Sequence, residues 1–254
     1  MAKNSKIEWT QHTWNPWQGC HKVSPGCKHC YMFREKIRYG QEPNVVIRSK
    51  DATFNAPLKW RDPAFVFTCS WSDFFIEEAD AWRDAAWQII RQTPHLTYQI
   101  LTKRPERIFQ CLPNDWDFSG YHNVWLIVSI ESQDETSRID ILQSPMIHAR
   151  VKGISAEPLL GSLDLTPYFQ LCNVGDEERD VWIEPIDWVI TGGESGIGQN
   201  YRPANLDWFR QIRDDCLAYD IPFFHKQHGG NKKINGVWGG RELDGRTWNE
   251  MPQP

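Results

Sequence analysis

The stretch that decides the fold is residues 124–155, V-W-L-I-V-S-I-E-S-Q-D-E-T-S-R-I-D-I-L-Q-S-P-M-I-H-A-R-V-K-G-I-S. Residues 124–130 are rich in apolar and β-branched side chains and predict the clearest strand of the chain. Residues 133–143 have the apolar spacing of a helix, with Pro145 just beyond its end. Residues 151–155 predict a second strand. A strand, a helix and a strand in this order predict a parallel βαβ unit.

The same alternation continues in both directions from this stretch. Further strands are expected at 65–70, 97–102, 188–191 and 222–225, and further helices at 31–39, 77–92, 105–112 and 203–219. The 254 residues suffice for one barrel domain. We therefore predict an α/β fold with a single parallel β/α barrel, partial or complete, of about six or seven βα units.

Two segments do not fit the alternation. Residues 158–184 are expected to form an acidic loop, and the Gly-rich and charged residues 229–254 a tail of turns packed on the barrel. The predicted domains are therefore the barrel at 1–228 and the tail at 229–254.

Composition restricts the environment of the protein. The chain has no apolar run of the ~18 residues that a membrane span needs, and its N-terminus lacks an apolar signal core. A cytoplasmic location without a membrane partner is the expectation, so the cysteines should be reduced thiols or metal ligands. The net charge of −5 argues against a surface built for nonspecific polyanion binding, although a local basic groove is compatible with it.

One loop concentrates chemically reactive side chains. Residues 14–31, W-N-P-W-Q-G-C-H-K-V-S-P-G-C-K-H-C-Y, hold Cys20, Cys27 and Cys30 in a C-x6-C-x2-C arrangement. A Pro-Gly pair inside the loop lets the backbone bend cheaply. The loop can therefore direct three thiolates towards one centre.

Two kinds of metal site suit three thiolates. A [4Fe–4S] cluster could be held through three of its irons, which leaves the fourth open for a substrate or cofactor. Alternatively, His21 or His29 could complete a four-ligand zinc site in a binding or adaptor module. A disulfide or a set of incidental thiols in an ordinary barrel enzyme is less consistent with an odd trio. The spacing alone leaves the cluster and zinc open.

Polar residues follow almost every predicted strand. In a β/α barrel these positions share the rim where active sites are assembled, and the cysteine loop lands on the same rim. Glu157, held between a strand and Pro158, is the hardest of them to explain as simple solvation. The candidates at this rim are Ser72, Asp73, Lys103, Arg104, Ser129, Glu131, Glu157, Glu194 and Lys226.

A series of motifs resembles a known family. They run in order from Glu8 to Pro252 and read W-N-P-x-x-G-C-x6-C-x2-C-Y, S-D-F-F, L-T-K-R-P-E-R, V-S-I-E, S-A-E-P-L-L-G, W-V-I-T-G-G-E-S-G, P-F-F-H-K-Q and L-D-G-R-T-W-N-E-M-P. Together they resemble a phage-associated family of unknown function that is regarded as radical S-adenosylmethionine (SAM)-like.

The resemblance implies a radical-SAM-like barrel and its cofactors. Cys20, Cys27 and Cys30 would hold a [4Fe–4S] cluster whose free iron binds SAM. Reductive cleavage of SAM would give a 5′-deoxyadenosyl radical that abstracts hydrogen from a substrate. The implied electron donor is an external flavodoxin- or ferredoxin-like protein, and the location of a phage-encoded enzyme is the host cytoplasm. The phage association suggests rearrangement of a modified pyrimidine nucleotide in phage DNA, an isomerase-type reaction on a nucleic acid or nucleotide.

The resemblance also suggests roles for the strand-end residues. SAM contacts are expected among Ser72, Asp73, Lys103, Ser129, Glu131 and Glu157, and catalytic or substrate contacts at Glu157, Glu194 and Lys226. Two features depart from the radical SAM superfamily. The first cysteine gap is six residues rather than three, and the Gly-Gly-Glu motif follows a late strand instead of the second.

Overall fold

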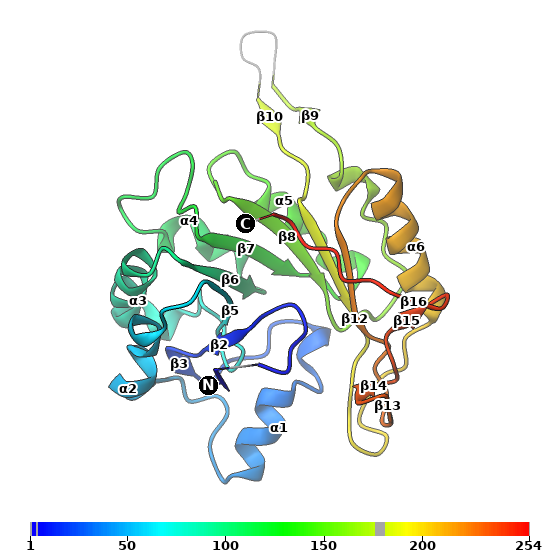
Figure 1. The fold of residues 1–254 in the computed structure, drawn as a ribbon, viewed down its shortest axis with the longest axis horizontal. Helices are drawn as coiled ribbons and strands as arrows, with labels where there is room; N and C mark the ends of the chain where they lie inside the picture. The colour runs from blue at the N-terminus through cyan, green and yellow to red at the C-terminus, as the bar shows by residue number, and fades with distance from the viewer. Residues whose placement is uncertain (1, 4, 176–180, 254) are drawn as a thin grey trace. The chain divides into compact units, whose positions relative to one another are not determined.

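A computed structural model describes residues 2–3, 5–175 and 181–253 (Figure 1). The chain folds as two compact units. The N-terminal unit comprises the chain up to Ile127 together with residues 147–150. The C-terminal unit comprises Val128–Met146 and the chain from Val151 to Gln253.

The N-terminal unit is built on parallel strands. β2 (His12–Trp14) pairs in parallel with β5 (Ala64–Thr68), and β5 pairs in parallel with β6 (Leu96–Thr102). β1 (Ala2–Lys3) adds an antiparallel edge to β2. β7 (Val124–Ser129) is next to β6 in the strand order, and its last residues belong to the C-terminal unit.

Helices follow these strands in sequence. α3 (Asp80–Gln92) buries Ala86, Trp87 and Ile90, as expected for an amphipathic helix. The other helical segments are η1 (Pro25–Cys27), α1 (Tyr31–Arg38), α2 (Asp51–Phe54), η2 (Ala56–Lys59), η3 (Glu77–Ala79), η4 (Pro105–Arg107) and α4 (Ile108–Cys111). A short ribbon of β3 (Trp17–Gln18) and β4 (Ile47–Arg48) precedes and follows the cysteine loop and α1.

The C-terminal unit is also built on parallel strands. β11 (Trp188–Gly192) pairs in parallel with β8 (Val151–Ala156) on one side and with β12 (Phe223–Gln227) on the other. α6 (Leu206–Ala218) connects β11 to β12, and the side chain of Asn205 caps it by accepting from the Asp207 amide at 3.0 Å. The unit also contains η5 (Gln133–Glu135), α5 (Ser137–Leu142) and η6 (Thr166–Tyr168).

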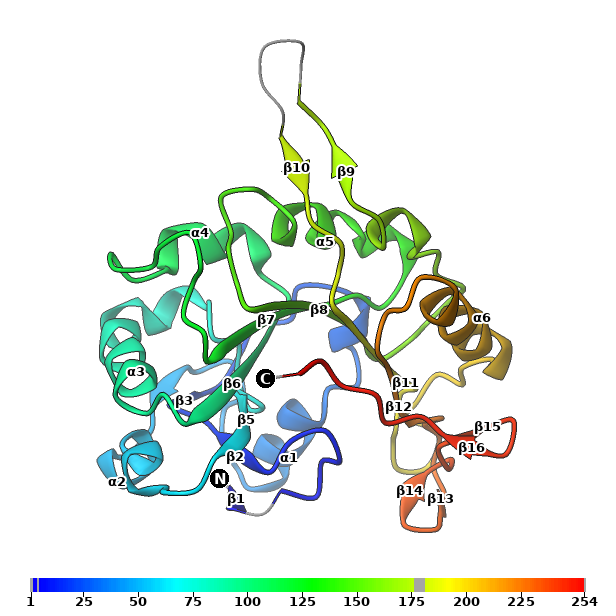
Figure 2. The ribbon, with the colours of Figure 1, turned by 45° about the horizontal axis from the view of Figure 1, so that its top comes forward.

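Three small hairpins were not predicted from the sequence. β9 (Cys172–Asn173) and β10 (Trp182–Ile183) pair within the segment expected to be a loop, and Figure 2 shows them extending away from β8. Residues 176–180 of that segment lie outside the described residues. The tail forms the pairs β13 (Lys233–Ile234) with β14 (Val237–Trp238), and β15 (Glu242–Leu243) with β16 (Arg246–Thr247).

The predicted strands and the parallel βαβ pattern are confirmed. Every residue of β7, β8 and β11 is buried, which is typical of parallel strands covered on both faces. The topology is that of an α/β fold and is consistent with part of a parallel β/α barrel. Among the described residues, the helices are all too short or too polar for a transmembrane span.

Candidate functional site

The start of the cysteine loop is pinned by backbone contacts. The amide of Gly19 donates to Trp71 O, and that of Cys20 donates to Pro43 O, each at 3.0 Å. Gly19 has a φ of +98°, and a Cβ at this position would lie 2.2 Å from Val45 O. Only glycine accommodates both the left-handed backbone and the close approach. The first cysteine is therefore fixed to the segments that contain Pro43 and Trp71.

Polar side chains after β2 and β5 strengthen this anchor. Ser72 Oγ donates to Gly19 O at 2.5 Å. Asn15 Oδ1 accepts from the Trp71 amide at 2.8 Å, while its Nδ2 donates to Ser70 Oγ at 3.1 Å. Ser72, one of the predicted SAM contacts, thus holds the loop, and Asn15 of the W-N-P motif does so too.

Cys27 lies within electrostatic range of both other thiols of the loop. All three are free and half-buried, and Cys27 influences the pKa of both Cys20 and Cys30. Burial raises the pKa of Cys20 to about 12, against the lowering effect of Arg104. Burial also raises the pKa of Cys30, while backbone amides in the first turn of α1 lower it. Within residues 2–3, 5–175 and 181–253, no group of three or more His, Cys, Asp or Glu side chains is arranged to hold a metal ion.

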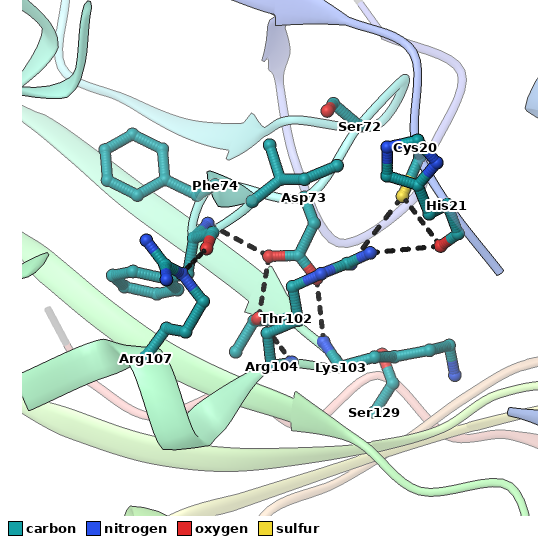
Figure 3. A network of polar contacts seen from close by, with 12 residues as sticks. Cys20, His21, Ser72, Asp73, Phe74, Thr102, Lys103, Arg104, Arg107 and Ser129 are labelled. Carbon is teal, nitrogen blue, oxygen red and sulfur yellow. Dashed lines mark hydrogen bonds and ion pairs between the residues drawn. The ribbon is translucent and has the colours of Figure 1, made fainter. Parts of the chain in front are cut away.

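Asp73 is the centre of the polar network shown in Figure 3. Its Oδ1 accepts from Thr102 Oγ1 at 2.7 Å and from the Phe75 amide at 3.0 Å. Its Oδ2 accepts from the Lys103 amide at 2.9 Å and from Arg104 Nη1 at 3.2 Å. This carboxylate is buried, and both of its oxygens are engaged by the protein. Asp73 therefore joins β5 to the end of β6.

Arg104 links Asp73 to the cysteine loop. Its Nη1 lies 3.7 Å from Cys20 Sγ, and its Nη2 donates to His21 O at 3.0 Å. Burial opposes its charge, but Asp73 and Cys20 outweigh burial and raise the pKa of Arg104 above its ordinary value. A buried, permanent cation is thus held beside the first thiol of the trio.

Lys103 contributes to the same region in a different way. Its backbone amide binds Asp73, whereas its ammonium end points away from that carboxylate (Figure 3). The positive charge of Lys103 lowers the pKa of Cys30. The consecutive residues Lys103 and Arg104 thus place one cation near each end of the cysteine motif.

In the C-terminal unit, Glu157 and Lys226 come together at the ends of β8 and β12. Lys226 Nζ lies 3.0 Å from Glu157 Oε1, and Ser155 Oγ donates to Glu157 Oε2 at 3.4 Å. The carboxylate lies against Gly192, where a Cβ would be 2.1 Å from Oε1. The sequence placed these two residues at strand ends, and the structure pairs them.

The other two predicted carboxylates of this unit are held by arginines. Arg202 donates to Glu194 Oε2 from its backbone amide at 2.7 Å and from Nε at 2.9 Å. Arg138 Nη1 donates to Glu131 Oε2 at 2.9 Å and to Ser129 O at 2.8 Å. Both carboxylates are buried, so their charges are compensated within the protein.

The candidate residues therefore form separate groups within each unit. Sequence reasoning favoured Lys103 over Arg104 and missed Asn15, Arg138 and Arg202. Asn15 could have been found from the W-N-P motif, because an Asn before Pro commonly organises a turn. Arg138 and Arg202 carry no local signal, since their roles depend on which carboxylate the fold brings to them.

These features define an α/β protein with parallel strands and a cysteine loop braced by a buried Asp–Arg pair. The chain belongs to the family described as "Protein of unknown function (DUF5131)", which matches residues 4–252. No curated protein and no solved structure matches the chain. The family description assigns no activity, so the chemistry has to be inferred from the residues.

Proposed function

We propose that this protein is a radical SAM enzyme whose cluster is held by Cys20, Cys27 and Cys30. When bound, a [4Fe–4S] cluster and SAM supply a 5′-deoxyadenosyl radical that removes hydrogen from an unreactive carbon. The observation that carries the proposal is the cysteine loop itself, with three free thiols on a pinned backbone and Arg104 3.7 Å from Cys20 Sγ.

The donor set fits such a cluster chemically. Each thiolate of a cubane binds a different iron, so the three sulfurs must surround a cluster rather than share one ion. Metal ligation requires deprotonated thiols, and burial alone opposes this at Cys20 and Cys30. Arg104 and Lys103 lower the pKa of these two thiols respectively, which favours the thiolate form.

The proposed SAM and substrate contacts follow from the same groups. The Lys103 ammonium suits the SAM carboxylate, while Ser72 and Asp73 act by fixing the loop and the Lys103 backbone. Ser129, Glu131 and Glu157 remain proposed SAM contacts in the C-terminal unit, with the Glu131 carboxylate oriented by Arg138.

The proposed substrate contacts are Glu157, Glu194 and Lys226. Glu157 and Lys226 form a pair that can exchange a proton with a bound substrate, since the two side chains are 15% and 29% exposed. Arg202 holds Glu194 in one orientation. The substrate class we propose is a modified pyrimidine nucleotide that undergoes rearrangement, with electrons from an external flavodoxin- or ferredoxin-like donor.

Anaerobic reconstitution with iron and sulfide tests the cluster directly. The wild-type protein should bind iron and sulfide and become brown, with broad absorption near ~400 nm. A Cys20→Ala/Cys27→Ala/Cys30→Ala variant should bind neither. The matched control Cys111→Ala/Cys172→Ala/Cys216→Ala removes the same number of thiols and should retain the cluster. Wild-type protein without cluster iron would contradict the proposal.

The role of Arg104 has a test that does not depend on turnover. A cation beside a cluster thiolate stabilises the more negative reduced state and raises the reduction potential. Arg104→Met should therefore lower the potential measured by EPR-monitored titration, and Arg104→Lys should lower it less. An unchanged reduction potential in Arg104→Met would show that Arg104 does not act on the cluster.

A zinc-binding adaptor is the second candidate. It is favoured by the contact between His21 Nε2 and Glu78 Oε1, because zinc-ligating histidines commonly hold a carboxylate with their other nitrogen. A colourless protein that contains zinc, and loses it in His21→Ala, would establish this alternative in place of radical chemistry.

A further inference from the structure

A basic segment stands out in this acidic chain. The chain carries a net charge of −5, yet Pro222 to Arg241 contains no Asp or Glu. The cations of the segment are Lys226, which pairs with Glu157, and Lys232, Lys233 and Arg241. Clustered cations without intervening acids create a local positive potential that attracts polyanions even when the whole protein is acidic.

The exposed part of this segment is the β13–β14 hairpin. Lys233 pairs with Trp238 in an antiparallel register, and the turn residues Asn235 and Gly236 have φ values of +50° and +85°. Asn-Gly with two positive φ angles is the preferred two-residue hairpin turn. Lys232 and Lys233 are both exposed on the first arm of the hairpin.

The base of the hairpin is fixed by close backbone packing. A Cβ at Gly193 would lie 1.9 Å from His228 O, and one at Gly239 would lie 2.2 Å from Gly229 O. The Gly229 amide donates to Trp238 O at 3.0 Å. Backbones approach this closely only where side chains are absent. The hairpin is therefore held in place rather than attached by a loose linker.

This anchoring ties the hairpin to the candidate substrate residues of the same unit. Gly193 directly follows β11, and its amide donates to Gln227 O at 2.9 Å, at the end of β12. The preceding residue of β12 is Lys226, which pairs with Glu157. Figures 1 and 2 show β13 and β14 reaching away from the end of β12.

The form of the hairpin favours phosphate contacts over base recognition. Lys233 Nζ lies 5.2 Å from the centre of the Trp238 ring, so it covers one ring face that a base would otherwise stack on. Two exposed ammonium groups instead suit the phosphodiester backbone, which supplies most of the sequence-independent affinity of nucleic-acid binding.

We infer that the β13–β14 hairpin binds the backbone of a nucleic acid, and that the substrate is a base carried by a polynucleotide rather than a free nucleotide. The link to the substrate rests on the proposed function, whereas the backbone binding stands on the hairpin alone. Exposed Glu242 lies just beyond the segment, which confines the positive surface to the hairpin and its base.

The inference can be tested by fluorescence anisotropy with a labelled single-stranded oligodeoxynucleotide, its duplex and the matching RNA. The test variant is Lys232→Glu/Lys233→Glu. The matched control is Lys50→Glu/Lys59→Glu, which changes two exposed lysines of the N-terminal unit by the same charge. Thermal unfolding of each variant verifies that it is folded.

The hairpin variant should lose affinity for at least one of the polymers while the control retains it. Its slope of log K against log salt should be shallower by about 1.5, because two phosphate contacts are lost. Equal binding by the hairpin variant, the control and the wild type would overturn the inference. Iron and sulfide are measured on the same preparations. If the wild-type protein contains the cluster but binds none of the polymers, only the inference about the hairpin is refuted. If it binds them normally but contains no cluster, only the radical chemistry is refuted.

Discussion

The Asp73–Arg104 pair of the N-terminal unit and the Glu157–Lys226 pair of the C-terminal unit differ in how far they are exposed. In the N-terminal unit, Asp73 and Arg104 have side chains that are only 5% and 10% exposed, and Asp73 also accepts from backbone amides and a hydroxyl. In the C-terminal unit, the paired Glu157 and Lys226 are 15% and 29% exposed. A saturated buried network specifies one geometry, whereas a partly exposed pair can exchange partners. The first therefore suits the positioning of thiols, and the second suits contact with a substrate.

The largest expected effect is in the first network. Asp73→Ala should destabilise the protein by about 3–5 kcal/mol, because it leaves Arg104 buried without its counter-charge. It also leaves the other donors to Asp73, the Thr102 hydroxyl and the Phe75 and Lys103 amides, without their acceptor. Urea unfolding followed by circular dichroism measures the change. Asp73→Asn keeps the size of the side chain and should cost less. A loss below about 1 kcal/mol in Asp73→Ala would remove the contrast between the two pairs, since such a loss is typical of exposed pairs.

A smaller effect is expected at Glu194. Glu194→Ala should cost about 2–3 kcal/mol, because Arg202 loses several charge-assisted hydrogen bonds but is 29% exposed and can be solvated in part. The same unfolding measurement applies, with Glu194→Gln as the size-matched control. A cost equal to or above that of Asp73→Ala would reverse the ranking of the two networks.

Acid should destabilise the C-terminal unit through His225. Burial, aided by His228 and Arg241, lowers the pKa of His225 to about 3 from an ordinary value near 6.5. Between these two pKa values the His225 imidazole binds a proton in the unfolded chain but not in the folded chain. The free energy of unfolding therefore falls as the pH drops below 6.5 towards 3. Between pH 6.5 and 5 the loss reaches about 2 kcal/mol. His225→Gln should show a shallower pH dependence of the urea midpoint, and an unchanged slope would exclude His225 as the cause.

The smallest effect concerns the glycine beside Glu157. Gly192→Ala introduces a Cβ 2.1 Å from Glu157 Oε1, which forces the carboxylate away from Lys226. Because a flexible side chain can move, the cost should be only about 1 kcal/mol. Gly161→Ala is the control, since no atom beyond its two chain neighbours lies within 4 Å of its added Cβ. Equal thermal unfolding midpoints for the two variants would show that the carboxylate is not confined.

Much of the fold could be predicted because its strands are apolar over their whole length. Residues 124–129 and 151–156 are entirely buried, and such runs are visible without knowledge of their partners. The hairpins of the tail were missed although they carry Asn235-Gly236 and Asp244-Gly245 at their turns. The flanking strands of two residues each are too short to show the alternation of apolar and polar side chains that indicates a strand.

The candidate site was predictable only in part. Cysteine spacing and strand-end positions can be read from the chain, so the motif from Cys20 to Cys30 and the region of Asp73 could be selected. Their partners could not, because Arg104 approaches Cys20 across 84 positions of sequence. Long-range pairing of this kind depends on the packed fold rather than on local pattern.

The six-residue gap between the first two cysteines has a mechanical consequence. Cys20 moves with the backbone that Pro43 holds, whereas Cys30 directly precedes α1 and Cys27 lies in the turn before it. A group bound to all three sulfurs would link the segment that carries Cys20 to the segment that carries Cys27 and Cys30. Release of that group should accordingly increase amide hydrogen exchange in residues 21–26 while the strands on either side stay protected.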